Sequence, residues 1–157
     1  MKEIERKFLV DPAKLPPDNR QMHLRQAYLS TDPARIVRIR IEDDRAIITI
    51  KGKLEGITRP EFEYAIPPDE AEEIMKLALY RPIDKIRHFI DTDGLTWEVD
   101  EFSGENQGLW LAEIELEDEN QLFTRPAWLG REVTLDHRYY NNELSILPFT
   151  RWSDKVF

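Results

Sequence analysis

The chain has 157 residues, of which 34% are charged and 41% are hydrophobic, and its formal net charge is -9. This length fits one domain spanning residues 1–157, and no stretch rich in proline, glycine and serine marks a linker. The negative charge argues against a nucleic-acid-binding protein, because affinity for the phosphate backbone requires lysine and arginine. The absence of cysteine excludes disulfides, thiolate metal sites and a cysteine nucleophile.

The N-terminal residues are charged where a secretory signal requires an apolar run. No run of about 18 apolar residues occurs elsewhere, so the sequence predicts no membrane span. We therefore expect a cytoplasmic protein that does not associate with membranes.

The first part of the chain alternates polar and apolar residues with period two, which is typical of β-strands. A proline-rich turn follows the first of these segments, and Asp43-Asp44 is a turn signal between two others. The predicted strands are Glu3 to Val10, His23 to Thr31, Arg35 to Glu42, Ala46 to Lys51 and Glu61 to Ile66.

The period then changes to that of an amphipathic helix. Prolines and acidic residues from Pro67 to Glu70 are typical of a helix N-terminus, and apolar residues continue at helical spacing as far as Ala78. Further along, Asp93-Gly94 is the favoured dipeptide of a two-residue hairpin turn. It predicts a hairpin of two strands, Ile83 to Asp91 and Leu95 to Phe102.

The last long strand is predicted from Gly108 to Glu117. The segment from Arg125 to Asn142 is mixed in character, and we expect it to end in a short helix that packs Tyr139, Tyr140 and Leu144 against the strands. The whole pattern predicts a mainly β (α+β) fold with about eight strands and a few helices.

The alternation gathers like charges on one face of each strand. Glu3 and Glu5 share a face with Lys7 on the first strand, and Arg38 and Arg40 share a face on the third. The other strands follow the same design, with Lys51, Glu61, Glu63, Lys85, Arg87, Glu98, Asp100, Glu113, Glu115 and Glu117.

For a single strand, such a face would usually be a solvated outer surface. Like-charged pairs two residues apart, however, repel one another unless a counter-ion lies between them. Pairs of acids could share hard divalent cations such as Mg²⁺ or Mn²⁺, and pairs of bases could hold phosphate oxygens. An eight-stranded antiparallel barrel is wide enough to enclose one small ligand. The pattern therefore indicates a metal-phosphate site inside a barrel.

The order of these motifs resembles that of a known family. The run Glu3-Ile4-Glu5-Arg6-Lys7 is similar to the E-x-E-x-K signature that opens members of the CYTH superfamily, the triphosphate tunnel metalloenzymes. The resemblance continues as far as Glu117, through Gln26-Ala27-Tyr28-Leu29, Val37-Arg38-Ile39-Arg40, Ile48-Thr49-Ile50-Lys51, Glu61-Phe62-Glu63, Lys85-Ile86-Arg87, Trp97-Glu98-Val99-Asp100 and Ala112-Glu113-Ile114-Glu115-Leu116-Glu117.

The resemblance implies a tunnel of eight antiparallel strands that binds a triphosphate with two divalent metal ions, Mg²⁺ or Mn²⁺. By position, the metal ligands are Glu3, Glu5, Glu113 and Glu115, with Glu61, Glu63, Glu98 and Asp100 as supporting ligands. The residues that bind the triphosphate are Lys7, Arg38, Arg40, Lys51, Lys85 and Arg87.

Lys85 is also a candidate to accept or relay the proton of the attacking water, together with Tyr28. Neighbouring Arg87 and the metal ions would lower the pKa of the Lys85 ammonium. For Tyr28 the alternative is a core or rim aromatic residue whose hydroxyl finds a hydrogen-bond partner.

The family covers several activities, and the short chain favours an inorganic triphosphatase that cleaves tripolyphosphate to pyrophosphate and phosphate. The alternatives are a class IV-like adenylate cyclase, a thiamine or nucleoside triphosphatase, and a non-catalytic sensor of triphosphate or polyphosphate. The expected partner is a small triphosphate, and a homodimer through an exposed barrel face is left open.

Overall fold

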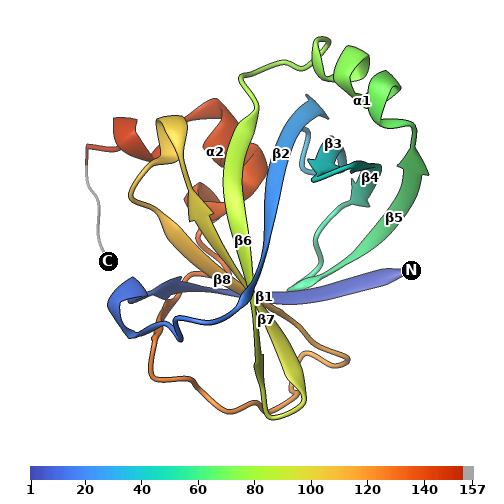
Figure 1. Ribbon diagram of the computed structural model, residues 1–157. Coiled ribbons are helices and arrows are strands. Elements are labelled where there is room, and N and C mark those ends of the chain that lie inside the picture. The colour runs from blue at the N-terminus through green and yellow to red at the C-terminus, as the bar shows by residue number, and fades with distance from the viewer. Residues whose placement is uncertain (154–157) are drawn as a thin grey trace.

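The structure is a computed structural model that describes residues 1–153. A single β-barrel carries two α-helices and several short 3₁₀ turns at its periphery (Figure 1). No helix in the described part of the chain is long and apolar enough to cross a membrane. The strands are β1 Lys2–Val10, β2 Arg20–Ser30, β3 Arg35–Glu42, β4 Arg45–Gly52, β5 Thr58–Ile66, β6 Ile83–Thr92, β7 Leu95–Phe102, β8 Trp110–Glu115 and β9 Leu129–Glu132, and the helices are α1 Pro68–Met75 and α2 Asn141–Ile146.

Strand β1 closes the barrel because it pairs with a different neighbour along each half of its length. Its first residues pair with β5, where Glu3 lies opposite Arg59, and its later residues pair with β8, where Lys7 lies opposite Glu113. The eight strands therefore follow the closed order β5-β4-β3-β2-β6-β7-β8-β1, and every pairing is antiparallel. The predicted eight-stranded antiparallel barrel is confirmed.

Two tight turns that the sequence predicted join neighbouring strands. Asp43, in the turn between β3 and β4, adopts a positive φ of 51°. Between β6 and β7, Asp93 and Gly94 have φ values of 49° and 81°. Asp and Gly are residues that tolerate this left-handed backbone, so the dipeptide matches a hairpin turn with the right twist.

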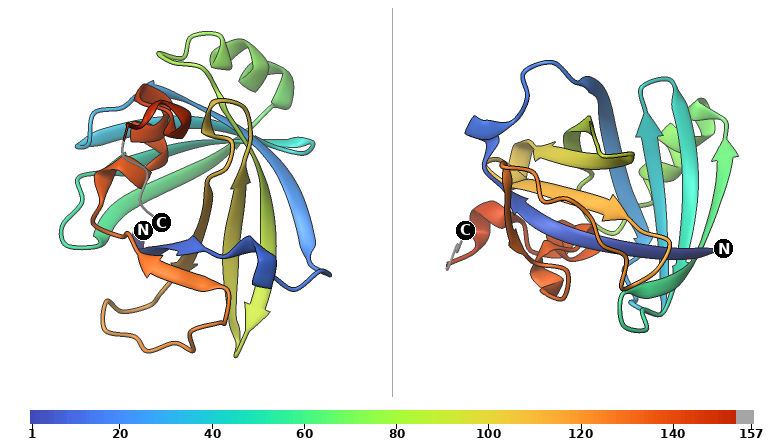
Figure 2. Two further views of the ribbon diagram at one scale, coloured as in Figure 1. Left: turned by 90° about the vertical axis from the view of Figure 1, so that its left-hand side faces the viewer. Right: turned by 90° about the horizontal axis from the view of Figure 1, so that it is seen from below.

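The apolar residues that alternate with the inward-facing charged residues along each strand lie on the outside of the barrel. Helix α1 packs Ala71 and Met75 over Ala27, Ile39 and nearby residues of β2, β3 and β4. The outer face of β1, β7 and β8 is covered instead by the long connection between β8 and β9, whose Trp128 packs on it. Figure 2 shows this connection running along the barrel well away from α1.

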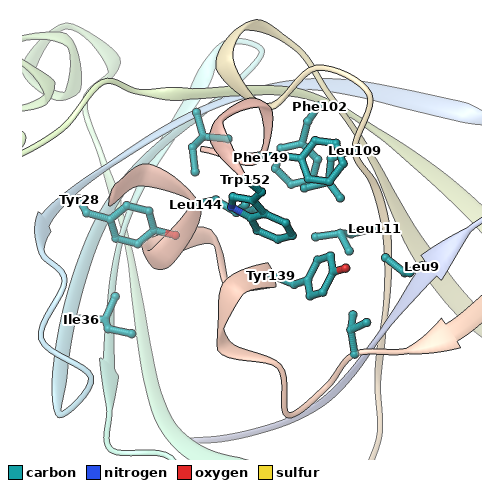
Figure 3. Packing of buried hydrophobic residues seen from close by; sticks show 12 residues of the cluster. Leu9, Tyr28, Ile36, Phe102, Leu109, Leu111, Tyr139, Leu144, Phe149 and Trp152 are labelled. Atoms are coloured by element: carbon teal, nitrogen blue, oxygen red, sulfur yellow. The ribbon is translucent and has the colours of Figure 1, made fainter. Parts of the chain in front are cut away.

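The C-terminal segment, residues 133–152, closes one mouth of the barrel. Tyr139, Leu144, Phe149 and Trp152 pack against inward-facing strand residues, among them Tyr28 (Figure 3). Leu144 is 0% exposed and Tyr139 is 1% exposed. The predicted packing of Tyr139 and Leu144 against the strands is thus confirmed, and the interior is a pocket with a closed end on this side.

Several boundaries differ from the sequence-based prediction. Strand β2 begins at Arg20, three residues earlier, and β8 ends at Glu115. Helix α1 ends at Met75 and leaves Leu77 72% exposed. The short strand β9, which was not predicted, adds to β1 beyond the barrel, with Phe8 opposite Glu132. Four residues are too few to show period two clearly.

Candidate active site

The inward faces of the strands enclose a cavity of about 170 Å³. This volume is well above what a single water needs, so the cavity has room for several waters or a small polyanion. All predicted site residues except Asp100 line it, and the other lining residues are Ile36, Leu54, Ile57, Arg59, Thr134, Tyr140, Asn141 and Asn142.

One part of the wall brings carboxylates together across neighbouring strands. Glu5 lies directly opposite Glu115 in the pairing of β1 with β8, and Glu98 lies opposite Glu113 in the pairing of β7 with β8. Like charges in directly opposed positions destabilise a sheet. Burial and the charges of Glu113 and Glu3 raise the pKa of Glu5 well above its usual value. These carboxyl groups therefore favour either protonation or a bound cation.

Other carboxylates of the wall are paired with lysines. The Lys7 Nζ atom lies 2.8 Å from Glu113 Oε1, and the Lys51 Nζ atom lies 2.9 Å from Glu3 Oε2. Burial alone would raise the pKa of Glu113, but Lys7 and the neighbouring cations hold it well below its usual value. Each of these ion pairs joins a predicted phosphate-binding residue to a predicted metal ligand.

Asp100 lies behind the cavity wall and binds two cations of β6. Its carboxylate accepts hydrogen bonds from Arg87 Nε at 2.7 Å and Arg87 Nη2 at 2.9 Å, and its Oδ2 lies 2.8 Å from Lys85 Nζ. Asp100 is 0% exposed and Lys85 is 1% exposed. Burial, together with Arg87, lowers the pKa of Lys85 to about 8, although Asp100 acts in the opposite direction. The metal-supporting role of Asp100 stays a prediction, since its oxygens are engaged here by Arg87 and Lys85.

Arginine side chains on β3 and β5 have donors that lack a partner. Arg38 donates to Thr49 Oγ1 at 3.1 Å, and Arg40 pairs with Glu42 at 2.6 Å. The buried Nε atoms of Arg38, Arg40 and Arg59 form no hydrogen bond within residues 1–153. Unpaired buried donors cost free energy, so an anion in the cavity would relieve this cost.

Tyr28 and Lys85 are connected indirectly. Gln26 Nε2 donates to the Tyr28 hydroxyl at 3.1 Å and to Asn141 Oδ1 at 3.2 Å, and Lys85 Nζ donates to the same Asn141 oxygen at 3.0 Å. Tyr28 also belongs to the apolar cluster at the closed end. Both predictions for Tyr28 therefore stay open: it could transfer a proton, or it could be a packed aromatic residue whose hydroxyl has a hydrogen-bond partner.

Sequence reasoning missed five polar residues of the cavity. Arg59 lies on the same face of β5 as Glu61 and Glu63, because it comes two residues before Glu61. A predicted strand that began before Pro60 would therefore have placed Arg59 in the cavity. The other four lie in the C-terminal segment, where no periodic signal places them on the inside: Thr134, Tyr140, Asn141 and Asn142.

The donor set fits divalent cations, although the carboxylates do not converge in this conformation. No group of three or more acidic or histidine side chains among residues 1–153 is arranged to hold a metal ion. The ion pairs of Glu3 with Lys51 and of Glu113 with Lys7 draw these carboxylates towards the bases. Carboxylate oxygens are the preferred ligands of Mg²⁺ and Mn²⁺. A triphosphate that bound to the lysines would break these ion pairs, and the carboxylates would then be available to bind metal ions.

The crowding of carboxylates has a measurable consequence at Glu61. Burial and its hydrogen bond with Glu3 raise the pKa of Glu61 from 4.5 to about 7. Between these values the folded protein binds more protons than the unfolded chain, so the free energy of unfolding falls as pH rises from 4.5 to 7. In metal-free buffer at pH 8 we expect Glu61→Gln to exceed the wild type in unfolding free energy by about 1–3 kcal/mol.

Urea denaturation at pH 8 and at pH 4 measures this effect. At the lower pH the two proteins should be nearly alike, because Glu61 is then mostly protonated in both states. Glu55→Gln on the exposed β4–β5 connection serves as the control and should match the wild type at both pH values. A wild type that is the more stable protein at pH 8 would contradict the prediction.

A closed barrel with carboxylates and bases on its inner wall defines a class of protein suited to enclose a polyanion. The CYTH domain model matches residues 1–148. The chain belongs to the CYTH family, which confirms the resemblance deduced from the motifs.

Two relatives cover nearly the whole chain. An inorganic triphosphatase of Acetivibrio thermocellus is 45% identical over 154 residues, which are 98% of this chain and 99% of that protein. An inorganic triphosphatase of Nitrosomonas europaea is 37% identical over 153 residues, covering 93% of this chain and 98% of that protein.

Solved structures agree with the fold. A crystal structure described as an inorganic triphosphatase is 35% identical, has a TM-score of 0.65, and covers 91% of this chain and 97% of its own. A Hippeastrum protein described as a candidate adenylyl cyclase that reveals a dominant triphosphatase activity is 16% identical, with a TM-score of 0.57, and covers 74% of this chain and 80% of its own. At that identity the second likeness shows the fold alone.

Proposed function

We propose that this protein is an inorganic triphosphatase, a metal-dependent phosphoanhydride hydrolase that cleaves tripolyphosphate to pyrophosphate and phosphate. The observation that carries the proposal is 45% identity to an inorganic triphosphatase over 98% of the chain. The cavity supports it independently, because its wall combines bases that bind phosphate with carboxylates that bind metal ions.

The bases of the wall would hold the phosphate oxygens. Arg38, Arg40 and Arg59 each have a buried Nε donor without a partner among residues 1–153. The remaining cations already face the cavity in ion pairs that a more highly charged ligand would replace, and they are Lys7, Lys51, Lys85 and Arg87.

The carboxylates would hold Mg²⁺ or Mn²⁺, with two ions per site. Glu5 and Glu115 are the strongest candidates, because they oppose one another across β1 and β8 and have no lysine or arginine hydrogen-bonded to them among residues 1–153. Glu3 and Glu113 would join them once their lysine partners bind phosphate, with Glu61, Glu63 and Glu98 in support. When bound, such ions neutralise phosphate charge and lower the pKa of coordinated water.

Side chains of the protein would accept the proton of the attacking water and stabilise the leaving group. Lys85 is enclosed by the barrel wall, and a pKa of about 8 leaves roughly a tenth of the amine neutral at pH 7 and about half at pH 8. A neutral amine can accept a proton from water that attacks the terminal phosphorus. The arginines would orient the phosphoryl groups and stabilise the charge that develops on the leaving pyrophosphate.

The test is release of phosphate and pyrophosphate from tripolyphosphate, ATP and thiamine triphosphate, each with Mg²⁺, with Mn²⁺ and with chelator. We expect metal-dependent cleavage with tripolyphosphate as the preferred substrate. Cyclic AMP with pyrophosphate would identify a cyclase, and tight binding without turnover would identify a sensor.

Removal of one metal-binding carboxylate gives a second test of the same proposal. Glu5→Gln removes the charge but keeps the size of the side chain, and we expect turnover to fall by about a hundredfold or more, since the ions carry much of the charge stabilisation. The substitution also removes the repulsion between the charges of Glu5 and Glu115, so the metal-free variant should not be less stable than the wild type. Turnover and metal dependence equal to those of the wild type would argue against the assignment.

A single domain over residues 1–157, a cytoplasmic location, the lack of nucleic-acid partners and a homodimer stay predictions from the sequence.

A further inference from the structure

The cavity extends to the segment that closes one mouth of the barrel. Asn141 and Asn142, at the start of α2, line the cavity at this end. Leu144 of the same helix packs with Phe149 and Trp152, and all three side chains are buried (Figure 3). The two amides therefore lie between the cavity and a fully packed apolar cluster.

The hydrogen bonds of Asn141 fix the direction of its side-chain amide. Its Oδ1 atom accepts from Lys85 Nζ at 3.0 Å and from Gln26 Nε2 at 3.2 Å. Both neighbours can only donate at these atoms, so the oxygen must face them. The Nδ2 group of Asn141 forms no hydrogen bond among residues 1–153 and is left to donate elsewhere.

Asn142 is the more unusual of the two. The residue is 6% exposed, yet its side-chain amide forms no hydrogen bond within the described residues. Buried polar groups in folded proteins normally have a partner, which can be ordered water or a ligand. The Asn142 amide has no partner in the part of the protein that the structure describes and opens onto the cavity, so it can donate to a ligand bound there.

We propose that the side-chain amides of Asn141 and Asn142 bind the oxygens of a terminal phosphoryl group at the closed end of the cavity. The nature of the ligand rests on the proposed triphosphatase function. Amide N–H groups donate to phosphate oxygens without placing another positive charge beside Lys85. Since the cluster around Leu144 fills the space behind them, the phosphoryl group bound here carries no substituent.

Isothermal titration calorimetry tests this subsite with diimidotriphosphate, an analogue of tripolyphosphate in which NH replaces both bridging oxygens and makes both bonds resistant to hydrolysis, in the presence of Mg²⁺. Asn142→Ala should weaken binding by about ten- to a hundredfold, the loss expected for a hydrogen bond to a charged group. Asn142→Asp keeps the size of the side chain and should weaken binding further, because a carboxylate repels phosphate. Diadenosine triphosphate, which has no free terminal phosphoryl group, should not bind the wild type.

Asn106→Ala is the matched control. Asn106 is likewise a buried amide, 4% exposed, and its Oδ1 accepts from the backbone N–H of Phe149 at 2.8 Å, but it does not line the cavity. All proteins are compared at a temperature at which circular dichroism shows them folded, and the control should bind like the wild type.

Wild-type affinity in both Asn142 variants, an equal loss in Asn106→Ala, or tight binding of diadenosine triphosphate would each overturn the proposal. The measurement does not depend on turnover. A wild type that binds the analogue but releases no phosphate from tripolyphosphate would count against the triphosphatase function and leave the subsite standing.

Discussion

Replacing Lys85 with alanine should lower the turnover of tripolyphosphate by roughly a hundredfold to ten-thousandfold, the usual contribution of a general base. The side chain is 2% exposed and its Nζ atom lies 2.8 Å from Asp100 Oδ2, so its position is well defined. Because its pKa is lowered to about 8, we also expect wild-type turnover to rise as pH increases through this value. Steady-state kinetics from pH 6 to 10 with saturating Mg²⁺ would measure both effects.

A second variant at the same position distinguishes a loss of proton transfer from a loss of packing. Lys85→Met retains most of the volume of the side chain, so it should lose activity as Lys85→Ala does while keeping more of the stability. Lys76→Ala removes an exposed lysine whose partner is Glu73 on α1, and should leave turnover unchanged. Turnover at the wild-type level in both Lys85 variants, with metal binding intact, would rule out the catalytic assignment.

Replacing Asp100 with alanine should destabilise the fold by about 3–5 kcal/mol, the cost of breaking a buried ion pair by removing one partner. The substitution leaves Lys85, which is 1% exposed, and Arg87, which is 8% exposed, without the carboxylate that both contact. Urea denaturation at pH 7 measures the difference. We expect Asp100→Asn to lie between the wild type and alanine, since an amide oxygen still accepts hydrogen bonds.

The exposed partner of Lys76 provides the control. Glu73 forms a comparable ion pair at 2.9 Å, but its side chain is 73% exposed, so Glu73→Ala should change the stability little. If Asp100→Ala were as stable as the control, Lys85 and Arg87 would have to be satisfied by other groups, and the buried triad would not support the wall.

The sequence determined the inner and outer faces of the strands by a period of two. Glu3, Glu5 and Lys7 face inward for the same reason that Ile4 and Phe8 face outward, because successive side chains of a strand point to opposite sides. This local rule sufficed to predict the barrel and nearly all of its charged wall. It failed at Arg59 only because Pro60 interrupted the predicted strand.

Only the tertiary structure decided which charges meet and where the cavity ends. The opposition of Glu5 to Glu115, and the sharing of Asp100 between Lys85 and Arg87, depend on the register between strands that lie far apart in the sequence. Asn141 and Asn142 enter the cavity because Leu144 and its neighbours pack into the mouth of the barrel. Period two dictates the face of each strand, but long-range packing sets register and closure, and no local pattern encodes them.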